Sequence, residues 1–293
     1  MIGATRQRIL RATTANLSWQ PQGADGDPAD PGTVTVSVTT SDGTELAAAG
    51  TATVGSGSNP RTVELTVAQT AALDVLTATW KVGSTTVATT KHDIVGGFYF
   101  TVAEFRGREP SAGDAGRDDL AAVKQARAEV EALFESACGM AFVPRFDVDH
   151  IRNVGWEIPL RPWVRNVRWV RVWYGTGLTD YSTLTTSQIA ALAPLDSGVI
   201  HLRDYSAEGA TVEIGYEHGL DAPPFDVKRE AMVAVRAQLH RTTGGTPDRA
   251  TSMQLGDGTS VTLATPGVGH WHTGIPSVDE VLRRYNHIAP SIG

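Results

Sequence analysis

The stretch DDLAAVKQARAEVEALFESAC, residues 118–138, carries the clearest helical pattern in the chain. Its apolar residues recur at intervals of three or four, which places them on one face of an α-helix. Asp118 can accept hydrogen bonds from free amide groups of the first turn, and Gly139 can end the helix. The pattern predicts a helix with one buried stripe, formed by Leu120, Val123, Ala126, Val130, Phe134 and Ala137.

The segment from Phe142 to Tyr216 changes to an alternating pattern that is typical of strands. We expect strands in VPRFDV, VRWVRVWYG, SGVIHL and ATVEIGY. A short helix is predicted at residues 187–193, behind the capping-box pair Thr185 and Gln188.

Two further helices are predicted toward the C-terminus. The first runs over 226–241, capped by Asp226, and the last over 277–286, where Ser277 and Glu280 have capping-box spacing. Between them, LGDGTSVTL predicts a hairpin whose turn contains Asp257. Another capping box, Thr101 with Glu104, predicts a helical turn near 101–106. The inward residues expected on the helices 226–241 and 277–286 are Val227, Ala231, Val235, Leu239, Val278, Val281, Leu282 and Tyr285.

The first 97 residues follow a different pattern. Nineteen of them are threonine, and short β-branched runs alternate with turn signals such as Asp42-Gly43. This predicts an immunoglobulin-like β-sandwich with Trp80 and Leu76 in its core. Ile94-Val95-Gly96-Gly97 is interpreted as a domain seam, which gives domains 1–97 and 98–293 and an α+β fold overall.

The bulk composition excludes some classes of protein. A net charge of −7 argues against a general nucleic-acid binder, which needs a basic face. No apolar run reaches the length of a membrane span, and no apolar segment typical of a signal peptide follows the N-terminal arginines. A single cysteine, Cys138, cannot form an internal disulfide, which fits a reducing cytoplasm.

Motifs that would indicate catalysis or cofactor binding are missing from the sequence. It has no phosphate-binding loop, no Gly-x-Ser-x-Gly elbow and no His-Glu-x-x-His pair. His270 and His272 lack a third ligand, and Asp25, Asp27 and Asp30 lack the glutamate that would complete a calcium loop. Cys138 is interpreted as a buried, unreactive thiol, and Glu213 and Glu217 as one strand face on the surface. We therefore expect no enzyme activity, cofactor or metal.

The segment RPWVRNVRWVRVWYG, residues 161–175, interleaves arginine and tryptophan. On a strand Trp169, Arg171 and Trp173 share one face, while Val170, Val172 and Tyr174 share the other. Three interpretations stay open: a subunit interface, because Trp, Tyr and Arg are enriched at binding hot spots; an intramolecular core; or stacking on single-stranded nucleic acid. The first is favoured.

The chain from Asp118 onward resembles the head-to-tail connector (adaptor) proteins of long-tailed phages, particularly those of actinobacterial hosts. Four stretches carry the likeness in order: the helix 118–138 with its VPR strand; IPLRPWVRNVRWVRVW; SGVIHLRDYSAEGATVEIGYEHGLDAPPFDVKREAMVAVRAQL; and RATSMQLGDGTSVTLATPGVGHWHTGIPSVDEVLRRYN. They cover about 175 residues. The N-terminal sandwich is not in the minimal family pattern and resembles the immunoglobulin-like decorations of phage structural proteins.

The resemblance implies a structural virion protein, made in the host cytoplasm and located in the virion neck. Such proteins form a ring, typically of twelve copies, that binds the portal protein, meets the next connector or stopper protein, and extends the DNA channel without specific DNA binding. Ring closure needs two different faces on each subunit. The expected subunit or portal interface comprises Arg161, Trp163, Arg165, Arg168, Trp169, Arg171, Trp173, Asp257 in the hairpin, and Arg283, Arg284 and Tyr285 in the last helix.

Other functions remain open at this point. The chain can be another neck protein, a stopper or a tail terminator. It can be a secreted or surface-exposed binding protein that uses the sandwich. It can also be an enzyme with an unfamiliar site, for which His201, Glu213 and His218 are the best candidates.

Overall fold

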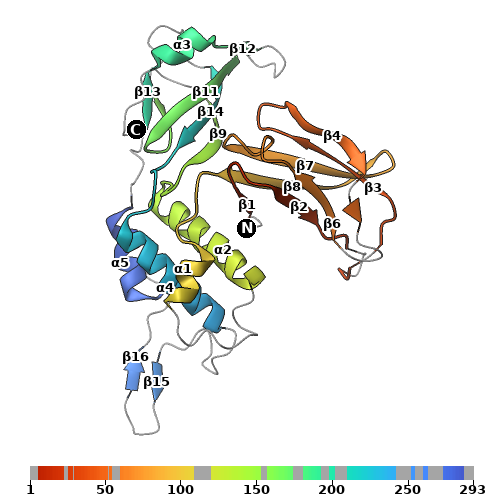
Figure 1. The fold of residues 1–293 in the computed structure, drawn as a ribbon. Coiled ribbons are helices and arrows are strands. Elements are labelled where there is room, and N and C mark those ends of the chain that lie inside the picture. The colour runs from red at the N-terminus through yellow and green to blue at the C-terminus, as the bar shows by residue number, and fades with distance from the viewer. Residues whose placement is uncertain are drawn as a thin grey trace. The chain divides into compact units, whose positions relative to one another are not determined.

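The computed structural model describes residues 6–22, 26–28, 30–51, 53–54, 60–108, 120–152, 157–173, 181–192, 198–201, 210–241, 252–254, 260–262 and 273–286. The fold is α+β, as predicted, and the chain forms two compact units (Figure 1). Unit 1 comprises residues 1–97 and 143–221, and unit 2 comprises 98–142 and 222–293. The seam at Gly97 is thus one boundary between units, and residues 143–221 group with the N-terminal sheets.

The N-terminal part of unit 1 contains two sheets. The larger has the strand order β1-β8-β7-β3-β4, with β1 parallel to β8, and the smaller has the order β2-β6-β5. The β-branched runs of the sequence coincide with the six strands β3 to β8, one run covering both β4 and β5, whereas the two short N-terminal strands, β1 and β2, were not predicted. The strands are β1 Gln7–Leu10, β2 Ala15–Trp19, β3 Val34–Thr39, β4 Glu45–Thr51, β5 Thr53–Val54, β6 Arg61–Leu65, β7 Asp74–Val82 and β8 Thr85–Val95.

The core of this sandwich is built from alternating inward residues of both sheets. Leu17 and Leu65 of the small sheet pack with Val36, Leu76 and Trp80 of the large one, and each is at most 2% exposed. Trp80 and Leu76 are therefore core residues, as predicted. Alternation arises because successive side chains on a strand point to opposite faces.

A buried histidine, His92, lies beside this core with the half-buried Thr90. The Trp80 indole donates a hydrogen bond to Thr90 Oγ1 (3.0 Å), which lies 2.8 Å from Nε2 of His92. Burial lowers the pKa of His92 to about 4, so its ring is neutral at pH 7.

The second part of unit 1 is a four-stranded antiparallel sheet of order β12-β11-β14-β9, beside the two-stranded sheet β10-β13 and the helix α3. The capping box predicted at Thr185 and Gln188 is present at the start of α3. The elements are β9 Arg145–Ile151, β10 Glu157–Pro159, β11 Val164–Trp173, β12 Tyr181–Thr183, α3 Thr186–Ala191, β13 Val199–His201 and β14 Thr211–His218.

Gly96, at the end of the sandwich, lies against Pro144, which directly precedes β9. Its amide donates to the carbonyl of Pro144 (2.9 Å), and a Cβ on Gly96 would lie 2.6 Å from Cβ of Pro144. Only glycine permits the two segments to come this close.

Unit 2 is helical, with α1 Val102–Gly107, α2 Leu120–Cys138, α4 Phe225–Arg241 and α5 Pro276–Arg284, and with the hairpin β15 Ser252–Gln254 and β16 Ser260–Thr262. Helices α2, α4 and α5 pack on one another. Aromatic rings fill their core, where Tyr99 contacts Phe134 and Phe142 edge to face, and Tyr285 contacts Phe142. The capping box of Thr101 and Glu104 is confirmed.

Three details of the helices were predicted wrongly. Leu120 is 45% exposed and lies outside the buried stripe of α2, because it occupies the first turn. Asp226 lies inside the first turn of α4 and does not precede it, since the two prolines before Phe225 already set the entry to the helix.

The third error is the cap of α5. The N-cap is Ile275, which has no capping side chain, and Ser277 lies within the helix. The buried carboxylate of Asp279 instead holds the segment before the helix: it accepts hydrogen bonds from the amides of Thr273 (2.9 Å) and Gly274 (3.1 Å).

Candidate subunit interface

Strand β11, which contains most of the predicted interface residues, is interrupted by two β-bulges. Its register against β14 slips between Val164 and Asn166 and again between Val167 and Trp169. At each slip one arginine has no residue of β14 opposite it in the strand register: Arg165 at the first and Arg168 at the second. A bulge adds a residue to one strand and redirects the side chains around it. The two arginines are therefore the extra residues of the bulges.

The bulges also set the inner face of the strand. Val170 and Val172 are buried, as the alternating pattern predicts. Val167 is three residues before Val170 and joins the same core because the bulge at Arg168 restores the phase. The sequence VRNVRWVRV thus places three valines on one face at spacings that a regular strand could not satisfy.

The outer face of β11 is covered by Trp169. Its indole lies across Gly215 of β14, where a Cβ would be only 2.3 Å from the ring carbon Cε2. The guanidinium of Arg171 lies 4.4 Å from the centre of the Trp169 ring and 3.1 Å from Glu213. This side of the strand is therefore a stacked layer of glycine, indole and arginine, half-buried within the chain.

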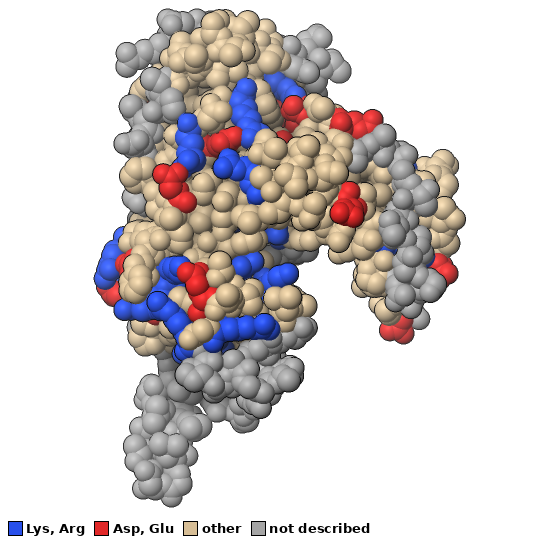
Figure 2. Space-filling view, in the orientation of Figure 1, with Lys and Arg blue, Asp and Glu red and all other residues tan. Residues whose placement is uncertain are grey.

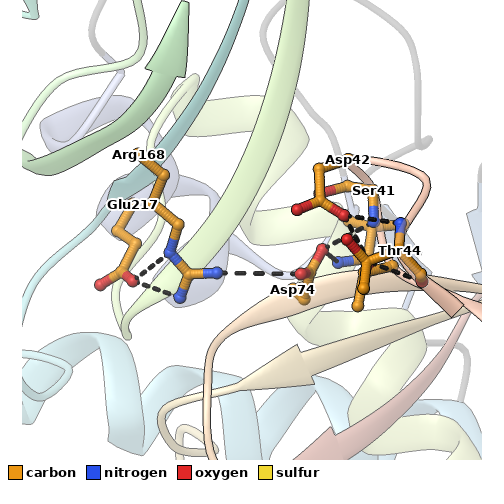
Figure 3. A network of polar contacts seen from close by, with 8 residues as sticks. Ser41, Asp42, Thr44, Asp74, Arg168 and Glu217 are labelled. Carbon is orange, nitrogen blue, oxygen red and sulfur yellow. Dashed lines mark hydrogen bonds and ion pairs between the residues drawn. The ribbon is translucent and has the colours of Figure 1, made fainter. Parts of the chain in front are cut away.

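Arg168 links three parts of unit 1 (Figure 3). It donates twice to Glu217 Oε1, at 2.8 and 2.5 Å, and its guanidinium lies 4.9 Å over the ring of Phe146. Its remaining nitrogen is 3.8 Å from the carboxylate of Asp74, which itself accepts from the amide of Ser41. Glu213 and Glu217 are thus arginine partners on one strand face.

Arg171 makes a parallel connection to the turn before β4, where it donates to the carbonyl of Asp42 (3.0 Å). Burial raises the pKa of the Asp42 carboxyl, but hydrogen bonds from Thr40 and Thr44 and the charge of Arg171 outweigh this, so its pKa is lowered overall. Arg168 and Arg171 therefore already serve contacts inside the chain. Whether they also take part in a subunit interface stays a prediction.

Trp163 is the exposed tryptophan of the group, whereas Trp169 and Trp173 are half-buried. Its φ is +62°, a left-handed conformation that costs a tryptophan on the order of 1–3 kcal/mol. Gly219 holds it there by donating to the Trp163 carbonyl (3.0 Å). The side chain remains 39% exposed. Strained backbone retained by its surroundings is a recurrent mark of functional positions.

Two arginines flank Trp163 in the sequence. Arg161 pairs with Asp147 (3.0 Å), and its amide donates to the hydroxyl of Tyr216. Arg165 pairs with the exposed Asp221 (2.6 Å). Both side chains are more than a third exposed, which distinguishes them from Arg168 and Arg171. Beside Arg165 an open cavity of about 450 Å³ lies between β11 and α3, lined by Arg165, Asn166, Val167, Arg168, Thr186, Ile189, Ala190 and Leu192.

The C-terminal residues predicted as interface lie together at the end of α5. Arg284 pairs with Asp226 of α4 (2.9 Å), and the Tyr285 hydroxyl donates to the same carboxylate (3.1 Å). Burial and the Asp226 carboxylate raise the pKa of Tyr285. Arg283 pairs with Glu280 on its own helix. Arg283 and Arg284 remain more than half exposed.

Some predicted positions cannot be placed. Asp257, His270 and His272 lie outside the described residues. Trp173 is half-buried at the end of β11, opposite Thr211 of β14.

The residues proposed for an unfamiliar enzyme have separate partners. His201 contacts Glu157, Glu213 contacts Arg171, and His218, which is fully buried, contacts Asp147. Glu213 and His218 point to opposite faces of β14. Within the described ranges no three His, Cys, Asp or Glu side chains gather as metal ligands would. In the same part of the chain no helix is long and apolar enough to cross a membrane.

Cys138 is buried at the end of α2, as predicted. Its thiol contacts the carbonyl of Leu282 (3.6 Å), and burial raises its pKa to about 12. The thiolate needed for nucleophilic chemistry is therefore not populated at neutral pH.

One exposed residue was not predicted. Phe225, the first residue of α4, is 67% exposed. The only signal in the sequence is Pro223-Pro224, which fixes the chain before it and leaves the first helical side chain free to point outward.

Comparison with known proteins gives likenesses to solved structures alone. No family model matches the chain, and no curated protein matches it. A chain in the solved structure described as "Neck of empty GTA particle computed with C6 symmetry" is similar, with 18% sequence identity and a TM-score of 0.43, over 67% of this chain and 93% of that one. At that TM-score the likeness supports no argument about this chain.

Proposed function

We propose that the chain is a structural protein of the neck of a phage-like particle, a head-to-tail adaptor. It forms a ring that joins the portal to the next neck component and lets DNA pass without binding it specifically. It has no enzyme activity and needs no cofactor. The ordered resemblance from Asp118 to Tyr285 supports this proposal at the level of sequence.

The structural observation that carries the proposal is Trp163. A large aromatic side chain is held in a strained backbone conformation and left 39% exposed, with two partly exposed arginines beside it. Folding gains less from Trp163 than from a fully buried tryptophan, because the left-handed backbone costs free energy and 39% of the residue stays exposed. A partner surface that covers the indole explains both features, and Trp with Arg is the usual composition of a binding hot spot.

The test combines assembly and location. The purified chain is mixed with its portal protein and observed by electron microscopy, and particles are examined for the position of the chain. We expect rings with the portal and the chain in the neck. A chain that stays monomeric with its portal and is missing from particles would contradict the proposal.

A matched pair of substitutions tests the role of Trp163. Trp163→Ala should weaken ring assembly by a factor of about 30, the effect of losing a hot spot worth roughly 2 kcal/mol. Val87→Ala, at a 42% exposed apolar position of the sandwich, should leave assembly unchanged. Circular dichroism of both variants confirms that the fold is retained. Equal effects of the two substitutions would show that Trp163 is not at an interface.

A further inference from the structure

Phe225 is the most exposed of the large hydrophobic side chains that the structure describes. The inward face of α4 is formed by Val227, Ala231 and Val235, all fully buried, and Phe225 lies off that face. Covering a phenylalanine side chain completely gains roughly 1.5–3 kcal/mol. The exposed ring therefore retains most of its capacity to stabilise a contact with another molecule.

The ring is positioned by the neighbouring helix α1. The guanidinium of Arg108 lies 5.8 Å from the ring centre, in the range of a cation–π contact. Lys228, one turn into α4, pairs with Glu104 of α1 (2.5 Å), and Glu104 is itself held by the capping box with Thr101. The Lys228–Glu104 pair thus joins α4 to α1 next to Phe225, and Arg108 gives the exposed ring a contact with a cation.

The surroundings of the ring are basic. Arg106 and Arg108 come from α1, and Lys228 and Arg229 from α4. Glu104 is the exposed acid among them, whereas Glu230, which pairs with Arg229, is only 3% exposed. Lys and Arg side chains gather over the helices of unit 2 (Figure 2). We call Phe225 and these four cations the Phe225 surface.

We infer that the Phe225 surface binds a second copy of the chain, against the acidic unit 1 of that copy. Unit 1 contains 13 Lys and Arg residues and 18 Asp and Glu residues, so its charge is opposite to that of the Phe225 surface. Complementary charge selects the partner and the register, while a central aromatic supplies affinity. The inference rests on the proposed ring.

The two partner surfaces come from different units. Contact between unit 2 of one copy and unit 1 of the next is head-to-tail, and head-to-tail contacts close into rings when the rotation between copies allows it. The Phe225 surface thereby provides one of the two different faces that a ring subunit needs.

Photo-crosslinking identifies the occupant directly. A benzophenone amino acid replaces Phe225 in one variant and Val67, a 49% exposed residue of the sandwich, in a control. Both variants are irradiated as purified chain and in assembled particles. We expect position 225 to yield a covalent dimer of the chain, with the crosslinked peptide in unit 1, and position 67 to yield less.

Other products overturn the inference. A crosslink from position 225 to a different protein or to DNA, or none in particles that contain the chain, would show that the surface has another role, while the proposed function stands. If the chain is missing from particles, the proposed function fails, and the purified chain decides the inference alone: a dimer through position 225 supports it, and a monomer overturns it.

A charge reversal provides a second measurement. Arg108→Glu should raise the concentration needed for self-association at least about tenfold, and added salt should weaken the wild-type association. Lys124→Glu, at an exposed site of α2 outside the surface, is the matched control and should have little effect. Equal effects of the two reversals would contradict a specific role for Arg108.

Discussion

Replacing Gly215 with alanine should destabilise unit 1 through a clash with Trp169. The added Cβ would lie 2.3, 2.6 and 2.7 Å from three atoms of the indole, whereas carbon atoms pack best at about 3.5–4.0 Å. The ring must therefore move by more than about 1 Å. Overpacking of this kind costs typically 1–3 kcal/mol.

Two smaller contributions to the free energy of unfolding nearly cancel. Moving the indole loses the stacking of Arg171, worth about 0.5–1 kcal/mol. Alanine is better than glycine in a strand by roughly 0.5–1 kcal/mol. We therefore expect Gly215→Ala to lower the free energy of unfolding by about 1–3 kcal/mol.

Urea denaturation followed by circular dichroism measures the effect, and a double-mutant cycle isolates its cause. In the background Trp169→Ala the clash partner is gone, so Gly215→Ala should be neutral or slightly stabilising. The coupling free energy should reach at least about 1 kcal/mol. If the alanine costs the same in both backgrounds, to within about 0.5 kcal/mol, the reasoning from the Trp169 ring is wrong.

Three further predictions concern other parts of the chain. Because the pKa of His92 is lowered to about 4, the unfolded chain binds more protons than the folded chain below pH 6.5. The free energy of unfolding should therefore fall by roughly 3 kcal/mol as the pH drops from 7 to 4. Denaturation curves at several pH values should show a weaker pH dependence for His92→Gln. Cys138, buried and with its pKa raised to about 12, should react with a thiol reagent only as fast as the chain unfolds. The rate of labelling, measured at increasing urea concentrations, should therefore follow the rate of unfolding, and fast labelling without urea would contradict the burial. Arg168→Ala leaves the carboxylate of Glu217 without the guanidinium that donates to it twice, and should lower the free energy of unfolding by about 1–3 kcal/mol in the same urea assay. Arg283→Ala is the control: it removes an exposed ion pair within one helix and should lower the free energy of unfolding by less than about 0.5 kcal/mol.

Residue patterns predicted the elements well where one local rule decides the outcome. The capping boxes at Thr101 and Thr185 and the buried pair Leu76 and Trp80 are as expected, because capping needs only a side chain three residues away and strand alternation needs only the pleat. The same rule failed at Ser277, because the helix begins one residue earlier, at Pro276, so that Ser277 lies inside its first turn.

The contacts of the Arg/Trp strand could not be predicted in this way. The carbonyl of Asp42 and the carboxylate of Asp74 come to Arg171 and Arg168 from more than 90 residues earlier in the chain, and no local pattern signals such a pairing. The exposure of Phe225 was missed for a similar reason, since a phenylalanine at the start of an amphipathic helix is normally assigned to the core.

The sequence by itself determined the α+β class, the helices, most strands and the valine face of β11, because periodicity and capping depend on neighbours a few residues apart. The tertiary structure alone decided which arginines of that strand are used inside the chain and which stay exposed beside Trp163. The reason is physical: two bulges redirect Arg165 and Arg168, Gly215 makes room for one indole, and Gly219 holds the other in a left-handed backbone that its own residue type disfavours.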